Sequence, residues 1–372
     1  MKKPIAVKGE DVMSRLMGSG SIKSTFLLSD SPFYMSKDTV TTEVPIINTA
    51  FSGDIDGGLV SGLTMFAGQS RTFKTLLGLY CMKAYLEKYP NAVAILYDSE
   101  FSITPEYLAT YNIDPTRIIH VPIEHIEQLK FDIVHRLDAI KRGDKVFILV
   151  DSLGMLGSKK EIDDAMDEKS VADMTRAKAI RSLLRIITPQ LTMKDIPCII
   201  INHIYQTLEM FSKNIMSGGT APTLAANQIF FITKAQEKDG DDLIGWKFTI
   251  SIDKSRFVRE KSKFSFIVTY EEGINKYSGI LDLALENGNV VRSGAAKGTR
   301  YALVNSETGE VGEEFKETQI YNESFLGSIL KETGFKEYVK NKFSLNKTLS
   351  AIDDEDDEIL DIEDEDLELI QE

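Results

Sequence analysis

Apolar and amphipathic segments alternate along this chain from Val44 to about residue 270. Several of the apolar runs are continuous, which is typical of strands buried on both faces. The runs are GLTMFAG, AVAILYDSE, RIIHVPI, KVFILVDSLG, IPCIIINHIYQ, NQIFFITKA and WKFTISIDKSR. Between them, apolar residues at helical spacing predict helices over residues 74–88, 104–111, 124–141 and 168–188. Strands and helices in this order predict an α/β domain around a mostly parallel sheet.

Different patterns flank this core. Residues 1–40 are polar, with a short helix candidate at GEDVMSRLM and an apolar patch at STFLL. After residue 270, GILDLALENGNVV predicts a short helix capped by Asn287 and Gly288, and RYALVNSETGEVGEEF predicts a hairpin turning at residues 307–309. A further amphipathic helix is expected at 323–342. The expected parts are an N-terminal segment 1–40, a core 41–270, a small C-terminal α+β domain 271–350 and a tail 351–372.

The acidic charge of the chain is concentrated at its end. The net charge is −14, but thirteen acidic residues and no Lys or Arg lie in 351–372, so residues 1–350 carry only about −1. The near-neutral body does not argue against nucleic acid as a ligand. Such a block is usually disordered and serves either as an interaction tail or simply to solubilise the protein.

Composition argues against several other classes of protein. Cys81 and Cys198 are too few and too far apart for a disulfide framework or a zinc cluster, which favours a reducing cytosol. The four histidines show no metal-ligand spacing. The N-terminus lacks the apolar core of a signal peptide, and no apolar run approaches bilayer-spanning length. We therefore expect a protein that is neither exported nor membrane-spanning.

The segment MFAGQSRTFKTLLGLY, residues 65–80, suggests a phosphate-binding loop that leads from a strand into a helix. In such a loop, backbone N–H groups surround the phosphates and a lysine reaches their oxygens. The residues expected to bind nucleotide here are Gly68, Ser70, Arg71, Thr72, Phe73, Lys74 and Thr75. Phe73 replaces the usual glycine, which we expect to be tolerated if its backbone stays outside the left-handed region. A strand-to-helix turn with a chance Lys-Thr pair is the alternative interpretation.

Two carboxylates at the ends of other expected strands strengthen the nucleotide hypothesis. Asp151 follows FILV and would hold Mg²⁺ together with Thr75. Glu100 ends AVAILYDSE and would orient and deprotonate a water that attacks the γ-phosphate. Because ligands of open α/β sheets bind beyond the carboxyl ends of the strands, these groups should converge. Any single carboxylate in such a place is more often a solvated strand end.

Taken together, AGQSRTFKT, YDSEFSITPEYL and VDSLGML resemble the corresponding motifs of the RecA-type recombinases, and among them those of the phage UvsX type. The similarity runs from about residue 40 to residue 310. It implies a RecA-like ATPase core, ATP and Mg²⁺ as cofactors, Glu100 as the catalytic base and Tyr107 as a platform that stacks on adenine. The implied activity is DNA-dependent ATP hydrolysis coupled to strand exchange.

The resemblance also assigns roles to three further polar residues. His203, in IINHIYQ, stands after the next strand where bacterial relatives carry a glutamine that senses the γ-phosphate. Lys254 and Arg256, in SIDKSRF, resemble a basic pair that reaches the neighbouring protomer's ATP. We expect these two side chains on the same face of a strand, since they are two positions apart. Without the resemblance, His203 would be a strand cap and the pair an ordinary basic edge.

Two segments are candidates for holding single-stranded DNA, which favours contacts to the backbone and apolar wedges over readout of base edges. The first is expected to begin as a polar loop after Asp151 and to continue as a basic helix, and its candidates are Lys159, Lys160, Arg176, Lys178 and Arg185. The second, a long loop after His203, offers Met210, Phe211, Lys213, Gly218 and Gly219. The alternatives are a solvated loop for the first and a buried Met-Phe plug for the second.

The resemblance implies that the protein forms helical filaments on single-stranded DNA and pairs that strand with homologous duplex, in phage recombination, repair and replication. Self, single- and double-stranded DNA, a single-strand-binding protein and a loader are the expected partners, and the host bacterial cytoplasm is the expected location. We expect residues 1–40 to dock on the adjacent protomer, with Phe26 or Leu27 as anchor. The alternatives are a ring-forming helicase or translocase, and a DNA-coating scaffold that does not hydrolyse ATP.

Overall fold

The computed structural model describes residues 9–22, 24–33, 38–167, 175–206, 214–271, 273–294 and 298–345. Met210, Phe211 and Lys213, which we predicted to contact DNA, and the acidic tail 351–372 lie outside these residues. None of the described helices combines the length and the apolar composition that crossing a bilayer requires.

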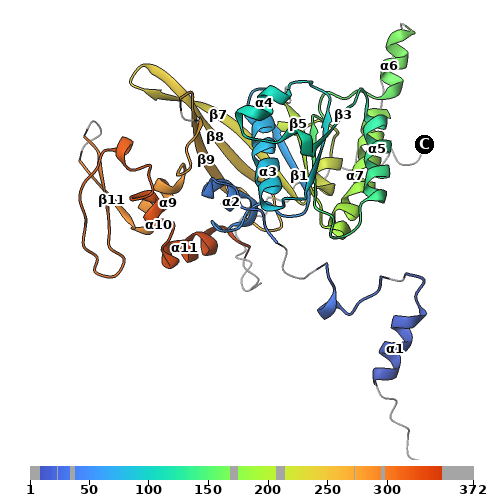
Figure 1. Ribbon diagram of the computed structural model, residues 1–372, viewed down its shortest axis with the longest axis horizontal. Helices are drawn as coiled ribbons and strands as arrows, with labels where there is room; N and C mark the ends of the chain where they lie inside the picture. Colours follow the sequence, from blue (N-terminus) through green and yellow to red (C-terminus); the bar gives the residue numbers. More distant parts are fainter. Residues whose placement is uncertain are drawn as a thin grey trace, which may run out of the picture.

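A single large sheet runs through the molecule, in the order β10-β9-β8-β7-β1-β5-β4-β2-β3, with β6 paired to β5 (Figure 1). From β7 to β3 neighbouring strands along this order are parallel, and β8, β9 and β10 extend the sheet antiparallel. The strands are β1 (Gly62–Gly68), β2 (Val93–Asp98), β3 (Ile118–Pro122), β4 (Val146–Asp151), β5 (Pro197–Gln206), β6 (Asn214–Met216), β7 (Gln228–Asp239), β8 (Asp242–Lys254), β9 (Lys263–Thr269) and β10 (Gly273–Ile274). The predicted mostly parallel α/β fold is confirmed.

Helices cover both faces of the sheet, and the side chains of β1 explain why. All seven β1 residues are buried, with Leu63 and Met65 packing toward α5 and α7 while Phe66 packs toward α3. A strand sandwiched in this way must be apolar on both faces, as its sequence is. The α-helices that precede the C-terminal part in the chain are α1 (Gly9–Ser19), α2 (Pro45–Ser52), α3 (Lys74–Lys88), α4 (Pro105–Thr110), α5 (Ile126–Ala139), α6 (Lys159–Met166), α7 (Thr175–Lys194) and α8 (Ala221–Ala225).

The C-terminal part packs against the outer, antiparallel strands (Figure 1). It contains α9 (Ile280–Asn287), β11 (Val290–Ser293), β12 (Arg300–Leu303), α10 (Leu326–Ile329) and α11 (Thr333–Phe343). As predicted, α9 is capped by Gly288, which adopts a left-handed φ of 81°. The buried apolar residues of α11 belong to the same continuous core cluster as α2, α3 and β9. The C-terminal part therefore shares its core with the large sheet.

Our prediction of one helix over 323–342 is wrong, because α10 and α11 are separate. Leu326 and Phe335 are both fully buried, yet nine residues apart they would lie about half a turn out of phase on a straight helix. The break allows both to reach the same core.

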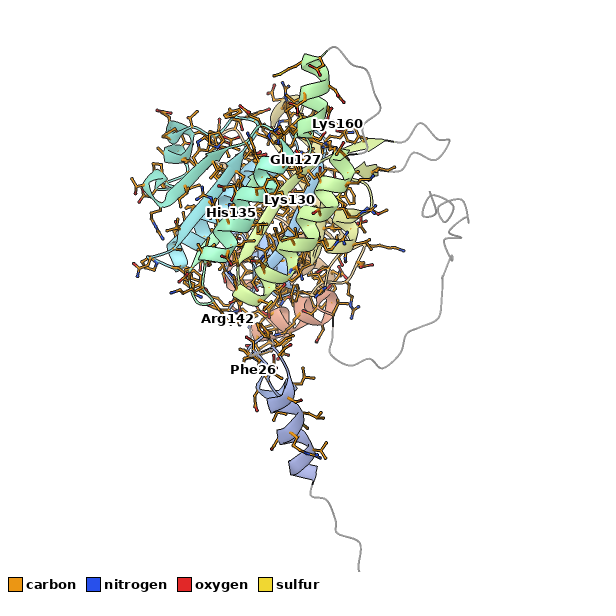
Figure 2. The ribbon with its side chains drawn as sticks, turned by 90° about the vertical axis from the view of Figure 1, so that its right-hand side faces the viewer. Phe26, Glu127, Lys130, His135, Arg142 and Lys160 are labelled. Carbon is orange, nitrogen blue, oxygen red and sulfur yellow. The ribbon has the colours of Figure 1, made fainter. Side chains whose placement is uncertain are left out.

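The N-terminal segment extends away from the rest of the molecule. Figure 2 shows Phe26 on this segment, below Arg142 and the face that carries Glu127, Lys130 and His135 of α5. Arg142 anchors the segment, since its guanidinium donates to Pro32 O (2.8 Å) and lies 5.1 Å from the Phe33 ring centre. Phe26 and Leu27 remain 46% and 40% exposed.

Candidate nucleotide site

A cavity of about 270 Å³ opens at the carboxyl ends of the parallel strands. Strand register places the candidates there, since Gly68 of β1 pairs with His203 of β5 and Asp98 of β2 pairs with Asp151 of β4. The cavity is lined by Ser70, Arg71, Thr72, Phe73, Lys74, Thr75, Leu76, Glu100, Tyr107, Asp151, Ile201, His203 and Phe248. The groups that we predicted to converge therefore do so.

The phosphate-loop candidate connects β1 to α3. Its first residue, Gly68, has no room for a side chain, because a Cβ would lie 2.5 Å from Ile232 O and 2.7 Å from Thr72 Oγ1. Lys74 is 5% exposed, and its Nζ donates to Gly68 O (3.1 Å) and Gln69 O (2.6 Å). Burial lowers the pKa of Lys74 to about 8, against the opposing influence of nearby carboxylates. This ammonium is held inside the loop rather than in solvent.

Phe73 corrects one expectation from the sequence. Its φ is 71° and its ψ is 7°, so its backbone is left-handed and the condition under which we expected Phe73 to be tolerated is not met. The ring packs on two aromatic residues of the antiparallel strands, with centroid distances of 4.7 Å to Phe248 and 5.5 Å to Phe266. Such aromatic pairs add to the stabilisation from burial alone. The packing of the ring thus offsets the backbone strain that a glycine would avoid.

Thr75 and Asp151 meet across the cavity. The Thr75 hydroxyl donates to Asp151 Oδ2 at 2.7 Å. Asp151 is 1% exposed, and its Oδ1 is buried without a hydrogen-bond partner among the described residues. Burial raises the pKa of Asp151 to about 6, and the Thr75 hydroxyl only partly opposes this shift. A buried carboxylate oxygen of this kind needs an additional partner when it is ionised.

Glu100 is held by two donors at its Oε1. The Ser152 hydroxyl donates at 2.6 Å, and His203 Nε2 lies at 3.1 Å. The hydrogen bond from His203 is the main reason why the pKa of Glu100 lies below its ordinary value, and burial opposes it. The close approach of His203 requires a glycine at 154, since a Cβ there would lie 2.6 Å from His203 Cδ2. Glu100 is therefore ionised and oriented at neutral pH.

Tyr107, on α4, also lines the cavity. Thr104 caps this helix by accepting from the Tyr107 N–H at 3.1 Å. The Tyr107 ring packs edge-on against Tyr111, with a centroid distance of 5.2 Å. Its position in the cavity lining fits the predicted platform for a flat base.

Lys254 and Arg256 do not line this cavity. Lys254 Nζ donates to Thr223 O at 2.6 Å, and Arg256 is exposed. β8 ends at Lys254, so Arg256 lies in the following turn and not on the same strand face as we expected. Within one protomer, the basic pair is separate from the candidate phosphate site.

The first DNA candidate segment begins with the expected loop after Asp151, but a helix that we did not predict, α6, follows this loop before α7. Ser158 and Glu161 form a capping box, which starts α6 at Lys159. Lys159 and Lys160 are exposed at this start, and Figure 2 shows Lys160 at the top of the α5 face. The sequence Ser-Lys-Lys-Glu contains this signal, which our prediction missed.

Arg176 differs from the other basic candidates on α7. Lys178 and Arg185 are exposed, but Arg176 is partly buried and its Nε and Nη2 groups are hydrogen-bonded. Its guanidinium donates to three backbone carbonyls, at 2.6 to 3.3 Å, and to Ser217 Oγ at 2.7 Å. The carbonyls belong to Leu153, Gly154 and Leu156. Arg176 therefore joins the loop after β4 to the turn after β6 through its Nε and Nη2 groups.

The second candidate segment is partly a hairpin. We predicted the strand to end at Asn202 and His203, but β5 continues to Gln206 and pairs antiparallel with β6. This pairing satisfies backbone groups that a free loop would leave to water. Gly218 and Gly219 follow, with φ of 101° and 67°, and lead to α8.

The parallel sheet, the loop before α3 and the facing carboxylates Asp151 and Glu100 define a nucleotide-hydrolysing protein of the P-loop class. Residues 14–275 match the family model RecA N-terminal domain. Residues 277–339 match the C-terminal domain model of the bacteriophage T4 recombination and repair protein. The chain therefore belongs to the RecA family.

Individual relatives agree with this membership. The chain is 47% identical to the recombination and repair protein of Enterobacteria phage T4 over 340 residues, which cover 90% of this chain and 86% of that protein. It is 26% identical to protein RecA of Chlorobium limicola over 289 residues, covering 77% and 79% of the two chains. The function that follows is that of an ATP-dependent recombinase: a DNA-dependent ATPase that binds nucleotide and DNA and associates with itself.

Proposed function

We propose that the cavity binds ATP at the contact between two protomers, and that the chain forms helical filaments on single-stranded DNA that carry out homologous pairing and strand exchange. One observation carries this proposal. A single cavity at the carboxyl ends of the strands is lined by Lys74, by the Thr75–Asp151 pair, by Glu100 with His203, and by Tyr107. These groups supply, in turn, phosphate binding, metal binding, activation of water and stacking on adenine.

Thr75 and Asp151 are suited to hold Mg²⁺. Asp151 Oδ1 is buried and has no hydrogen-bond partner in the part of the chain that the structure describes. This oxygen and the adjacent Thr75 hydroxyl are hard oxygen donors of the kind that Mg²⁺ prefers. When bound, Mg²⁺ would supply neutralisation of the charge on the phosphate oxygens. Lys74 would turn from the loop carbonyls toward those oxygens.

Glu100 is the proposed general base. Its carboxylate is ionised, lines the cavity and is oriented by Ser152 and His203. In the absence of a phosphate, His203 donates to Glu100. A γ-phosphate oxygen would compete for the same N–H. Phosphate binding would therefore shift His203, and with it β5 and the hairpin that β5 forms with β6.

Several exposed features support assembly. Lys254 and Arg256 lie outside the protomer's own cavity, which suits a role at a neighbour's ATP. α1 exposes Val12, Met13, Leu16 and Met17, and its segment 1–40 is the proposed docking arm. The proposed division into core 41–270, C-terminal part 271–350 and tail 351–372 completes this organisation.

The proposed DNA contacts come from exposed side chains on α6 and α7 and from the turn after β6. Lys159, Lys160, Lys178 and Arg185 would meet phosphates, and the Gly218–Gly219 turn would present backbone N–H groups. A single-strand-binding protein and a loader are the proposed further partners, in the cytoplasm of an infected bacterium.

The decisive experiment measures ATP hydrolysis stimulated by single-stranded DNA in Glu100→Gln. Loss of the base should lower turnover by about 10²-fold or more while ATP-dependent DNA binding remains. Glu106→Gln, an exposed carboxylate on α4, is the matched control and should keep its activity. Electron microscopy should show helical filaments on single-stranded DNA. Closed rings, or full turnover in Glu100→Gln, would contradict the proposal.

A further inference from the structure

The turn that carries Glu100 is fixed by a residue that does not touch the cavity. Asp98, the last residue of β2, is 1% exposed. Its Oδ1 accepts from the N–H groups of Glu100 (3.0 Å) and Phe101 (2.7 Å). Phe101 adopts a left-handed φ of 53°, and a non-glycine residue holds that conformation only when its surroundings impose it. The Asp98 carboxylate is part of what imposes it.

The second oxygen of Asp98 has a partner on the next strand. His120 Nε2 lies 3.1 Å from Asp98 Oδ2. Since a carboxylate oxygen accepts, the His120 ring must donate from Nε2. His120 Nε2 therefore donates to Oδ2, while the N–H groups of the turn donate to Oδ1. A buried carboxylate that lost this donor would lose part of the compensation for its desolvation.

His120 belongs to β3, which is the last strand at its end of the sheet. Its side chain is 45% exposed. Neither Asp98 nor His120 lines the nucleotide cavity. The hydrogen bonds of this pair reach the nucleotide cavity through the turn that presents Glu100, and the charge of Asp98 also acts on Asp151 of the neighbouring strand.

The other side of the turn is tied independently. The Ser99 N–H donates to Asp151 O at 2.8 Å, and the Ser152 N–H donates to Ser99 Oγ at 3.0 Å. Lys74 and Thr75 lie in the first turn of α3, and the hydrogen bonds described for them go to Gly68, Gln69, Thr72 and Asp151 rather than to Asp98. Disturbing the Asp98–His120 pair should consequently affect the position of the base more than nucleotide binding.

We infer that Asp98 and His120 are positioning residues for the catalytic base, through which the edge strand β3 holds Glu100 in place for attack. This inference rests on the proposed role of Glu100. The inference adds that the position of Glu100 depends on the exposed side chain of His120, on the edge strand of the sheet.

The test compares two full-length variants at the exposed position. His120→Leu removes the donor, whereas Gln in His120→Gln can still donate an N–H to Asp98. Under saturating single-stranded DNA, we expect His120→Leu to lower kcat by about tenfold with KM for ATP within about twofold, since misplacing a catalytic group costs rate rather than binding. His120→Gln should recover most of the lost kcat. A normal kcat in His120→Leu, an equal loss in both variants, or a loss confined to KM would overturn the inference.

Two controls separate this inference from the proposals on which it rests. Filaments of His120→Leu formed with a non-hydrolysable ATP analogue should have normal length; if they do not form, the residue serves assembly and the positioning role is wrong. In the Glu100→Gln background, adding His120→Leu should cause no further loss, because the two residues act on one step. Full activity in the single variant Glu100→Gln would instead show that Glu100 is not the catalytic base. If Glu100→Gln loses activity but His120→Leu keeps a normal kcat, only the positioning role of Asp98 and His120 is rejected.

Discussion

At the scale of single residues, Phe73 shows how an altered motif is kept in shape. The left-handed backbone at this position favours glycine, while the ring lies against Phe248 and Phe266. At Phe73 the strained backbone therefore lowers stability, while the packing of the ring raises it. The substitutions Phe73→Gly and Phe73→Ala separate them, because both remove the ring but only the first also removes the strain.

We expect both variants to be destabilised, and Phe73→Ala to be the less stable by about 1 kcal/mol, the approximate cost of a left-handed conformation for a residue with a Cβ. Urea unfolding measured on both variants checks this order. If Phe73→Ala proves as stable as Phe73→Gly, the backbone at 73 is not strained in solution.

The individual site residues differ in how far the sequence could reveal them. Lys74, Thr75, Asp151 and Glu100 follow strands, and the topology of parallel sheets brings strand ends together. Their convergence was therefore predictable. The hydrogen bond from Ser152 to Glu100 and the packing of Phe248 on Phe73 link positions 52 and 175 residues apart. No local pattern encodes such pairs, and they became visible only in the structure.

At the scale of elements, the apolar pattern predicted most strands and the helices α3, α4, α5 and α7, whereas α2 and α6 were not predicted. The expected helix over 74–88 agrees with α3, because its apolar residues recur at helical spacing against a buried sheet. The extension of β5 to Gln206 was not predictable in the same way, since it depends on pairing with β6 across a segment rich in polar residues. Tertiary pairing decided the outcome where the local pattern was ambiguous.

Helix α7 carries two basic residues with different environments, and this difference gives a test. Lys178 is exposed, whereas Arg176 donates to the loop after β4 and to Ser217. Lys178→Gln should lower the salt dependence of single-stranded DNA binding by about 0.7 in the slope of log K against log salt, the value for one lost phosphate contact. Arg176→Gln should leave that slope unchanged and lower the free energy of unfolding by about 1–3 kcal/mol, since buried carbonyls lose a charged donor.

DNA-binding titrations at several salt concentrations, combined with urea unfolding of the same variants, distinguish the two roles. A reduced slope in Arg176→Gln with unchanged stability would show that this guanidinium leaves its carbonyl partners to bind phosphate.

At the scale of the whole molecule, the C-terminal part and the ATPase sheet share one apolar core. Phe343 of α11 packs on Phe264 of β9 with a centroid distance of 4.7 Å, and Ser344 Oγ donates to Gly53 O at 3.1 Å. A change in the pattern of expected elements after residue 270 predicted a small C-terminal domain. Such a pattern does not show which surfaces pack together in the folded protein. Elements that bury one core are expected to unfold together.

Phe343→Ala tests this cooperativity. Phe343 is 7% exposed, so its truncation should cost about 3–5 kcal/mol, the usual range for a buried phenylalanine. Phe131→Ala on α5 removes the same atoms from a side chain that is 59% exposed, and it should change stability by no more than about 0.5 kcal/mol. Scanning calorimetry should show one transition in the wild type and in both variants, shifted to lower temperature only in Phe343→Ala. Two transitions, of which Phe343→Ala moves only one, would mean that the C-terminal part folds as an independent unit despite the contacts that join it to β9.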